Sequence, residues 1–283
     1  MSKKFGEQQV LHSLDLGIEH GKLVGFLGPN GAGKSTTIRI LMGLLKKTSG
    51  RAYVLEHDVQ TDGHQIRSDV GYLPGDVNLY SQLTGIQTLQ FMAAARKKDC
   101  VAEAVRLSEV FDLDIGKRVR QYSTGMKQKL GLIQALMHRP KLLILDEPTS
   151  ALDPLVRTEV FRELRESIGR DQTVLFSSHS LDEVESLCDE VVVLREGRIV
   201  EKQTIDQLRN RALKRICVVF KKPIQEMAYP EGFQNPKLNG RNLNGIWSGN
   251  LQVLLSWLAE YEVEDLVLER PDLNDLFLSF YTE

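Results

Sequence analysis

Residues able to hold phosphate groups occur early in the sequence, in a glycine-rich stretch. The residues from Gly28 to Ser35 fit the pattern G-x-x-x-x-G-K-S/T, with an apolar run before them and apolar residues at helical spacing after them. Glycines let successive backbone N–H groups surround one anion, and the following helix directs its positive dipole end at the same point. Lys34 can reach the outer phosphates, and the Ser35 hydroxyl suits Mg²⁺. We therefore predict a loop that binds a nucleoside triphosphate; the alternative is a plain strand–helix turn.

Two carboxylates follow a short apolar run at residues 141–150, KLLILDEPTS. The run is too short for a helix and is typical of a buried parallel strand. Asp146 would help to hold Mg²⁺, and Glu147 could polarise the attacking water. A strand that ends in an acidic turn is the alternative, but the phosphate loop favours the catalytic interpretation.

A third apolar run, QTVLFSSHS at residues 172–180, ends at His179. In open α/β sheets, ligands bind beyond the carboxyl ends of the strands. The phosphate loop, the two carboxylates and His179 all follow such ends. His179 is therefore a candidate contact of the γ-phosphate, and a purely structural histidine is the alternative.

A fourth candidate is the segment at residues 121–140, where Ser123 precedes apolar residues at helical spacing. Ser123 fits the N-cap position of a helix. The sequence Ser-Thr-Gly before a helix could also form a second anion-binding N-terminus. A capped helix without a ligand is the alternative.

Composition limits the class of protein. The chain has 283 residues, 42% hydrophobic and 26% charged, with a formal net charge of −2 and three cysteines. These values predict a globular protein without a disulfide framework or a general attraction to nucleic acid. No apolar run approaches the ~20 residues of a spanning helix, and residues 1–11 do not resemble a secretory signal.

The order of predicted elements indicates an α/β fold. Residues 1–70 are expected to form strands around the phosphate loop, residues 84–140 helices, and residues 141–205 alternating strands and helices. Such alternation predicts a mainly parallel sheet.

A change of pattern near residue 209 predicts a second, small α+β domain. Its expected elements are a strand at residues 214–222, tight turns at Asn239-Gly240 and Asn244-Gly245, and an alternating strand at residues 262–269. Expected helices lie at residues 251–261 and 271–281. Apolar residues in helical phase in these two segments are Leu251, Leu254, Leu255, Leu258, Leu273, Leu276, Phe277 and Phe280. We interpret Trp247 and Trp257 as packing residues.

The order of the motifs over about residues 5–205 resembles the ATP-binding subunit of an ATP-binding-cassette (ABC) transporter. The resemblance implies a P-loop nucleoside-triphosphatase cassette at residues 1–208, with antiparallel strands near the N-terminus and a helical subdomain at about residues 76–140. The small α+β domain would occupy residues 209–283. Similar C-terminal extensions occur on subunits of exporters for drugs, antibiotics or lipids.

The resemblance also implies a role for each matching position. Glu147 would be the general base and His179 the switch histidine, while Ser35 and Asp146 would bind Mg²⁺. The ATP contacts implied by the family motifs are Phe5, Gly28, Pro29, Asn30, Gly31, Ala32, Gly33, Lys34, Ser35, Thr36, Ser123, Gly125 and Asp153.

These contacts would form in three places. Phe5 resembles the aromatic residue that stacks on adenine. Ser123 and Gly125 belong to YSTGM, which resembles the signature loop LSGGQ and would act on the ATP of a neighbouring subunit. Asp153 ends SALD, which resembles the D-loop. Family members work as dimers, so each site would combine two cassettes.

The sequence departs from the family pattern at several positions. The signature has Tyr122, Thr124 and Met126 where Leu, Gly and Gln are usual. Gly75 stands where a glutamine usually contacts Mg²⁺ and water. Either Asp76 or a water molecule takes over this contact, or the metal relies on Ser35 and Asp146 alone; we favour the latter. Only four residues precede Phe5, so the first strand of the family is expected to be absent or truncated.

We predict an ATP-hydrolysing subunit that uses ATP and Mg²⁺, pairs with a second cassette and energises a separate membrane-spanning subunit. It would lie in the cytoplasm, on the inner face of the cell membrane, and export drugs, antibiotics or lipids. A soluble cassette ATPase acting on ribosomes or DNA is the alternative. The single phosphate loop, the absence of a heptad run and the near-neutral charge argue against it and against a nucleic-acid partner. A non-hydrolysing sensor would not need Glu147 and His179.

Overall fold

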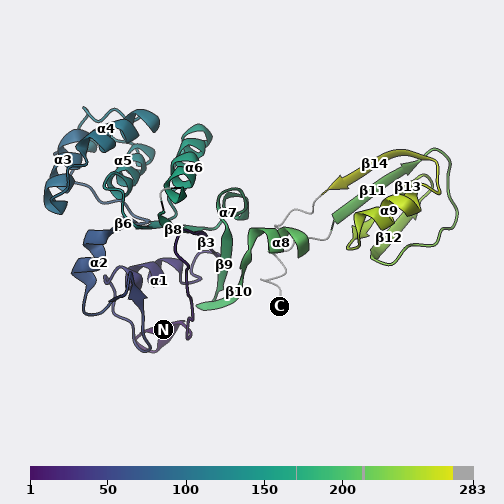
Figure 1. Cartoon of the computed structure of the whole chain (residues 1–283), viewed down its shortest axis with the longest axis horizontal. Helices are drawn as coiled ribbons and strands as arrows, with labels where there is room; N and C mark the ends of the chain where they lie inside the picture. The colour runs from purple at the N-terminus through teal and green to yellow at the C-terminus, as the bar shows by residue number, and fades with distance from the viewer. Residues whose placement is uncertain (170, 212–213, 270–283) are drawn as a thin grey trace. The chain divides into compact units, whose positions relative to one another are not determined.

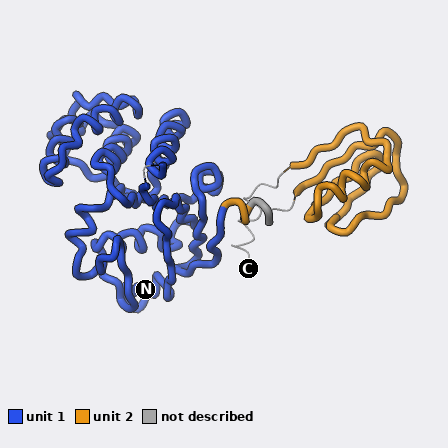
Figure 2. Tube along the Cα trace, in the orientation of Figure 1, with its two compact units in different colours: residues 1–204 blue, residues 205–283 orange. Residues whose placement is uncertain are grey.

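The structure, a computed structural model, describes residues 1–169, 171–211 and 214–269. The chain divides into two compact units, residues 1–204 and residues 205–283 (Figure 2). The helix expected at residues 271–281 lies outside the described residues.

A six-stranded sheet in the order β10-β9-β3-β8-β7-β6 forms the centre of unit 1 (Figure 1). All neighbouring strands are parallel except β10, which is antiparallel to β9. β3 and β8 are buried throughout, as expected for parallel strands that are covered on both faces. The strands are β3 Leu23–Leu27, β6 Val70–Leu73, β7 Leu142–Asp146, β8 Thr173–Ser178, β9 Glu190–Arg195 and β10 Arg198–Thr204.

Short antiparallel strand pairs lie in the N-terminal part of unit 1. β1 (Lys3–Phe5) pairs with β2 (Gln8–Leu11), and β4 (Tyr53–Val54) pairs with β5 (His57–Asp58). The first strand is therefore present, but it is only three residues long. These pairs and the mainly parallel sheet confirm the predicted α/β fold class.

Helices connect the strands of unit 1. They are α1 Lys34–Leu41, α2 Gly63–Asp69, α6 Pro154–Ile168 and α7 Leu181–Leu187. The apolar core between the helices and the sheet includes Phe26, Ile38, Ile40 and Val192, each fully buried.

A helical group occupies residues 84–136 and lies at one end of unit 1 in Figure 1. It consists of α3 Gly85–Arg96, α4 Val101–Val110, the short 3₁₀ helix η1 Val119–Gln121 and α5 Thr124–Leu136. Thr84 and Gln87 form a capping box at the start of α3. The helical segment predicted between residues 84 and 140 is thus confirmed.

Unit 2 contains an antiparallel sheet in the order β12-β13-β11-β14. Its elements are α8 Ile205–Arg211, β11 Lys214–Phe220, β12 Phe233–Asn239, β13 Asn242–Trp247, α9 Leu251–Leu258 and β14 Val263–Glu269. Trp247 is buried, and Trp257 packs against the same core, which confirms both tryptophans as packing residues.

Two expectations for unit 2 are corrected. Asn239-Gly240 connects β12 to β13 as predicted, but Asn244-Gly245 lies inside β13. Gly245 makes room for an aromatic ring, because a Cβ atom there would lie 2.3 Å from Cε1 of Phe233.

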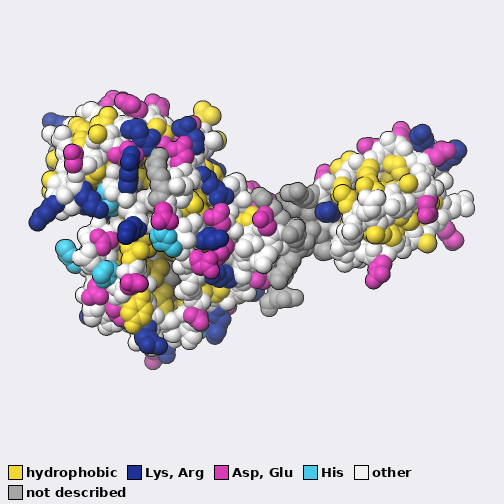
Figure 3. All heavy atoms as spheres, in the orientation of Figure 1, with side chains coloured by type: hydrophobic (Ala, Val, Ile, Leu, Met, Phe, Trp, Pro, Cys, Tyr) yellow, Lys and Arg dark blue, Asp and Glu magenta, His cyan; other side chains and the backbone are white. Residues whose placement is uncertain are grey.

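The second correction concerns α9. Leu254 and Leu258 are buried, whereas Leu251 and Leu255 are exposed, so the four leucines do not form one buried face. Figure 3 shows apolar side chains on the visible face of unit 2.

Candidate functional site

The loop between β3 and α1 takes its shape from glycine. Gly31 and Gly33 have φ angles of 83° and 105°, which residues with a side chain rarely adopt. A Cβ atom on Gly28 would lie only 2.4 Å from the carbonyl oxygen of Leu194. The chain can therefore follow this path only with glycines at these positions.

Lys34, the first residue of α1, is buried in the loop, with only 5% of its surface exposed. Its Nζ donates to the carbonyl oxygens of Gly28 at 2.7 Å and Pro29 at 3.2 Å. The N-cap residue Gly33 has no side chain to cap the first turn, and Ser35 is exposed in that turn. A lysine and the N-terminus of a helix thus place positive charge at one point, which favours anion binding.

A buried serine holds the two carboxylates at the end of β7. Ser177 Oγ donates to Asp146 Oδ1 at 2.7 Å, and the backbone N–H of Glu147 donates to Ser177 Oγ at 2.9 Å. The pairing of β7 with β8 puts Asp146 beside Ser177. Ser177 was not predicted from the sequence, although serines at the end of an otherwise apolar strand are a visible signal.

Glu147 lies between two cationic or ionisable groups. One carboxylate oxygen is 3.4 Å from Lys34 Nζ, and the other is 3.6 Å from His179 Nδ1. The φ angle of Glu147 is 49°, a left-handed conformation that is uncommon for a residue with a side chain. The ends of β3, β7 and β8 therefore bring Lys34, Glu147 and His179 together, as the sequence predicted.

Further buried contacts, which local sequence patterns do not predict, hold the segment after β7. Glu183 accepts hydrogen bonds from Thr149 Oγ1 at 2.8 Å and Ser178 Oγ at 2.7 Å. Gln128 of α5 donates to the carbonyl oxygen of Glu147 at 3.2 Å. These contacts connect the carboxylate segment to β8, α7 and the helical group.

The loop after β6 approaches the carboxylates at Gly75. A Cβ atom there would be 3.4 Å from Asp146 Oδ2, an ordinary contact distance. Asp76 is exposed. Burial raises the pKa of the nearby Tyr72 phenol, and the charge of Asp146 acts in the same direction.

The two signature residues contact other parts of their own chain. Ser123 accepts a hydrogen bond from the backbone N–H of Met126 at 3.2 Å, and this confirms it as the N-cap of α5. Gly125 faces the segment after β7, because a Cβ atom there would be 2.7 Å from the Ala151 carbonyl oxygen. Among the described contacts, neither residue touches the phosphate loop.

Asp153 and Phe5 also lie apart from the cluster around Lys34. Asp153 is the N-cap of α6 and accepts hydrogen bonds from the backbone N–H groups of Leu155 and Val156, each at 3.1 Å. The N–H group of Val156 lowers the pKa of the Asp153 carboxyl. Phe5 is 48% exposed at the end of β1, with Lys3 Nζ 4.6 Å from its ring centroid.

The buried strand, the glycine loop, the lysine at a helix start and the two carboxylates at the end of β7 in the same sheet define a P-loop nucleotide-binding protein.

Comparisons with known proteins agree with this class. The family model described as "ABC transporter" matches residues 11–150. The ABC transporter ATP-binding protein YdbJ of Bacillus subtilis is 39% identical over 75% of this chain and 71% of its own. The daunorubicin resistance ATP-binding protein DrrA3 of Streptomyces coeruleorubidus is 35% identical over 98% of this chain and 92% of its own. A solved ATP-binding subunit of an ABC transporter has a TM-score of 0.68 and 32% identity, covering 74% of this chain and 89% of its own.

The chain belongs to the ATP-binding proteins of the ABC transporter family, and it is an ATPase. Within the ranges that the structure describes, no helix is both long and apolar enough to cross a bilayer.

Proposed function

We propose that residues 28–36 bind the phosphates of ATP and that Glu147 activates the water that attacks the γ-phosphate. The observation that carries this proposal is the contact of Glu147 with both Lys34, at 3.4 Å, and His179, at 3.6 Å. Lys34 would move from the loop carbonyls to the phosphates, and His179 would stabilise the transferring phosphoryl group.

Ser35 and Asp146 fit a magnesium ion held partly by phosphate oxygens. Mg²⁺ usually binds proteins through one or two carboxylates, with substrate phosphates and water completing its shell. Among the described residues, no group of three or more His, Cys, Asp or Glu side chains could hold a metal alone. The exposed hydroxyl of Ser35 and the Asp146 carboxylate at the carboxyl end of β7 are suitable ligands. The ion would neutralise charge on the phosphates during transfer.

A second cassette would complete each ATP site through its Ser123 and Gly125. Ser123 and Asp153 are exposed, and Leu155 beside Asp153 is 81% exposed, which suits an interface. Phe5 would stack on adenine. We also propose residues 1–208 as the cassette and residues 209–283 as a separate small domain.

A membrane-spanning subunit would dock on the helical group near the Gly75 loop, holding this chain at the inner face of the membrane. Tyr80 and Phe91 support this placement, since they are 65% and 49% exposed and their rings meet edge to face at 5.8 Å. The relatives DrrA3 and the bacitracin transport protein BcrA of Bacillus licheniformis suggest an exported drug or antibiotic. Isolation from native membranes, followed by identification of the co-purifying membrane subunit, tests this assignment.

Two substitutions test the chemistry. Lys34→Ala should weaken ATP binding strongly, because it removes the only cation that the loop directs at the outer phosphates. Glu147→Gln should bind ATP but lower the turnover rate by ~10²–10⁴-fold, the usual effect of losing a general base. Calorimetry measures binding, and phosphate release measures turnover.

The matched controls are Lys222→Ala and Glu264→Gln in unit 2. These two variants should change neither the ATP affinity nor the turnover rate. Unchanged ATP affinity in Lys34→Ala would contradict the phosphate-loop assignment. Near-normal turnover in Glu147→Gln would mean that another group is the base.

A further inference from the structure

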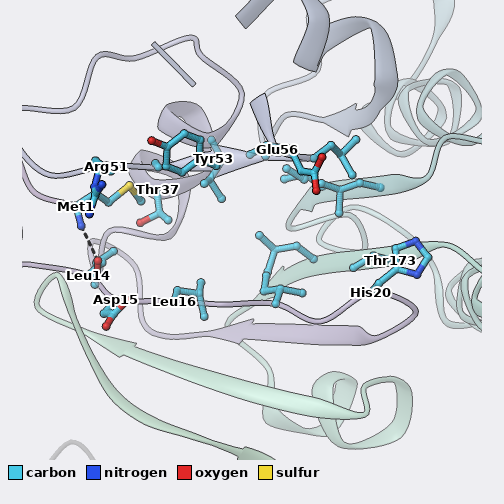
Figure 4. Close-up of a pocket in the computed structure, with 18 residues that line it drawn as sticks. Met1, Leu14, Asp15, Leu16, His20, Thr37, Arg51, Tyr53, Glu56 and Thr173 are labelled. Carbon is cyan, nitrogen blue, oxygen red and sulfur yellow. Dashed lines mark hydrogen bonds between the residues drawn. The ribbon is translucent and has the colours of Figure 1, made fainter. Parts of the chain in front are cut away.

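A buried carboxylate adjoins the segments that carry the proposed catalytic residues. A cavity of about 550 Å³ beside the N-terminal strands has no such relation to them, because the described residues that line it include neither Lys34 nor Glu147 nor His179 (Figure 4). The carboxylate belongs to Glu183 of α7, and its residue is buried in unit 1. A buried charge requires hydrogen-bonding partners, and the partners of Glu183 show which segments it holds together.

Both carboxylate oxygens of Glu183 accept a hydrogen bond from a buried hydroxyl group. Thr149 Oγ1 donates to one oxygen at 2.8 Å, and Ser178 Oγ donates to the other at 2.7 Å. Arg157 Nη1 of α6 forms an ion pair with the first oxygen at 3.4 Å. Glu183 therefore joins three parts of unit 1 to α7, namely the segment after β7, the end of β8 and the start of α6.

The contact with Ser178 determines where the backbone of His179 lies. Ser178 Oγ accepts a hydrogen bond from the backbone N–H of Ser180 at 2.9 Å, so one hydroxyl group connects the residues on both sides of His179. The same hydroxyl donates its proton to Glu183, which sets its direction. Glu183 thus fixes the short piece of backbone from which the imidazole of His179 extends.

The other two contacts hold the segment that follows Glu147. Thr149 begins this segment two residues after Glu147, and Arg157 ends it near the start of α6. Both residues contact the same carboxylate oxygen of Glu183. Since a carboxylate oxygen of Glu147 lies 3.6 Å from His179 Nδ1, Glu183 connects the backbone on both sides of that contact.

We propose that Glu183 is a positioning residue for ATP hydrolysis, which sets the place of His179 relative to Glu147. This role rests on the proposed function, in which both residues act at the γ-phosphate. Hydrogen bonds to a charged carboxylate are stronger than those to a neutral acceptor, so they hold the two segments firmly. Without Glu183 the two segments would move independently, and a misplacement of about 1 Å costs ~10²-fold in rate.

The test compares substitutions that keep the size of the side chain. Glu183→Met removes the carboxylate oxygens, whereas Glu183→Gln keeps an oxygen for one hydroxyl group and gains an amide that donates to the other. Glu163→Met is the matched control, because Glu163 is also buried and accepts two hydrogen bonds from Arg106, each at 2.8 Å. Thermal unfolding shows that each variant is folded at the assay temperature.

Glu183→Met should lower kcat by about 10²-fold, while KM for ATP should change by less than about twofold because the phosphate loop is intact. Glu183→Gln should restore kcat to within about threefold of the unsubstituted protein, and Glu163→Met should stay within the same range. Equal losses of kcat in Glu183→Met and Glu163→Met would overturn the proposal, because they would reflect a general loss of stability.

A second measurement follows the His179 ring without nucleotide. Its ¹³C–¹H cross-peak, assigned with His179→Ala, should shift in Glu183→Met and stay in place in Glu163→Met. Ser178→Ala, which removes only the hydroxyl group beside His179, should shift the same peak and replaces Glu183→Met if that variant does not fold.

The two measurements separate failure of this role from failure of the proposed function. An unshifted His179 peak in Glu183→Met would overturn the role of Glu183 and leave the function of Glu147, tested by Glu147→Gln, untouched. A shifted peak with unchanged kcat would also overturn it, and would contradict the part that His179 plays in the proposed function.

Discussion

At the scale of single residues, the site depends on buried side chains that lie outside the phosphate loop. Ser177 is fully buried, and its hydroxyl joins the Asp146 carboxylate to the backbone of Glu147. A charged group that accepts a hydrogen bond in a buried place is held in one orientation. We expect Ser177 to act as a positioning residue for both carboxylates.

Ser177→Ala should lower kcat by about 10-fold, equivalent to ~1.4 kcal/mol, because it releases both groups from their fixed positions. KM for ATP should change by less than about twofold, since the phosphate loop is untouched. Steady-state phosphate release measures both constants. Ser108→Ala, which removes another buried hydroxyl far along the chain in α4, is the matched control. An equal loss of kcat in both variants would mean that the effect is a general loss of stability.

Gly75 leads to a second prediction at the residue scale, which concerns whether Asp76 binds Mg²⁺. It lies beside Asp146 but has no side chain to reach a metal, while Asp76 is exposed. Moving a contact by one residue in an extended loop turns the side chain to the other side. Asp76→Ala should therefore leave the Mg²⁺ dependence of hydrolysis by the isolated protein nearly unchanged. ATPase rates measured against Mg²⁺ concentration check this, with Asp146→Asn as the variant that should raise the requirement. A large rise in the Mg²⁺ requirement of Asp76→Ala would show that Asp76 is a ligand.

At the scale of elements, tertiary packing overrides a local turn signal in β13. Asn-Gly pairs favour tight hairpin turns, yet only Asn239-Gly240 forms one. At Gly245 the missing side chain instead admits the ring of Phe233 from the neighbouring strand.

Gly245→Ala should destabilise unit 2 by about 1–3 kcal/mol, because the added methyl group overlaps the Phe233 ring. Both tryptophans of the chain, Trp247 and Trp257, lie in unit 2, so their fluorescence during denaturation follows this unit. Gly17→Ala is the control, since a Cβ atom there would meet nothing within 4 Å. If Gly245→Ala left the denaturation midpoint measured by tryptophan fluorescence unchanged, β12 could move aside without loss of stability.

Local sequence signals predicted the parts of the site that lie at the ends of strands. Three apolar runs mark the strands β3, β7 and β8, and Lys34, the pair Asp146 and Glu147, and His179 lie at or beyond the ends of these runs. Ser177, Glu183 and Gln128 were not predicted, because their contacts depend on how segments far apart in the sequence align. Helical periodicity likewise placed Leu251 and Leu255 on one helical face with Leu254 and Leu258, but periodicity alone cannot tell which residues of an apolar face are buried.

At the scale of the whole molecule, the proposed composite site requires two chains. The cluster around Lys34 and the signature residue Ser123 have no contact within one described chain. Consider a dimer in which one chain lacks a working phosphate loop and the other lacks a working signature loop. One of its two sites would still combine an intact phosphate loop with an intact signature loop.

Ser123→Arg and Lys34→Ala should each be inactive alone, yet their mixture should regain part of the ATPase activity. Phosphate release by a purified heterodimer, in which each chain carries a different tag, measures the recovery. A mixture of two Lys34→Ala chains with different tags is the control. Complete inactivity of a verified heterodimer would argue that each chain hydrolyses ATP by itself.

The position of β3 in the sheet has a consequence for biosynthesis. β3 lies between β8 and β9, but residues 23–27 leave the ribosome well before residues 173–195. At ~5–20 residues per second, the apolar β3 strand waits roughly 7–30 s for its first neighbour. During that time both of its edges can pair with strands of other nascent chains. Slower translation of the helical group should therefore increase aggregation and the need for chaperones, even though the finished protein would be unchanged.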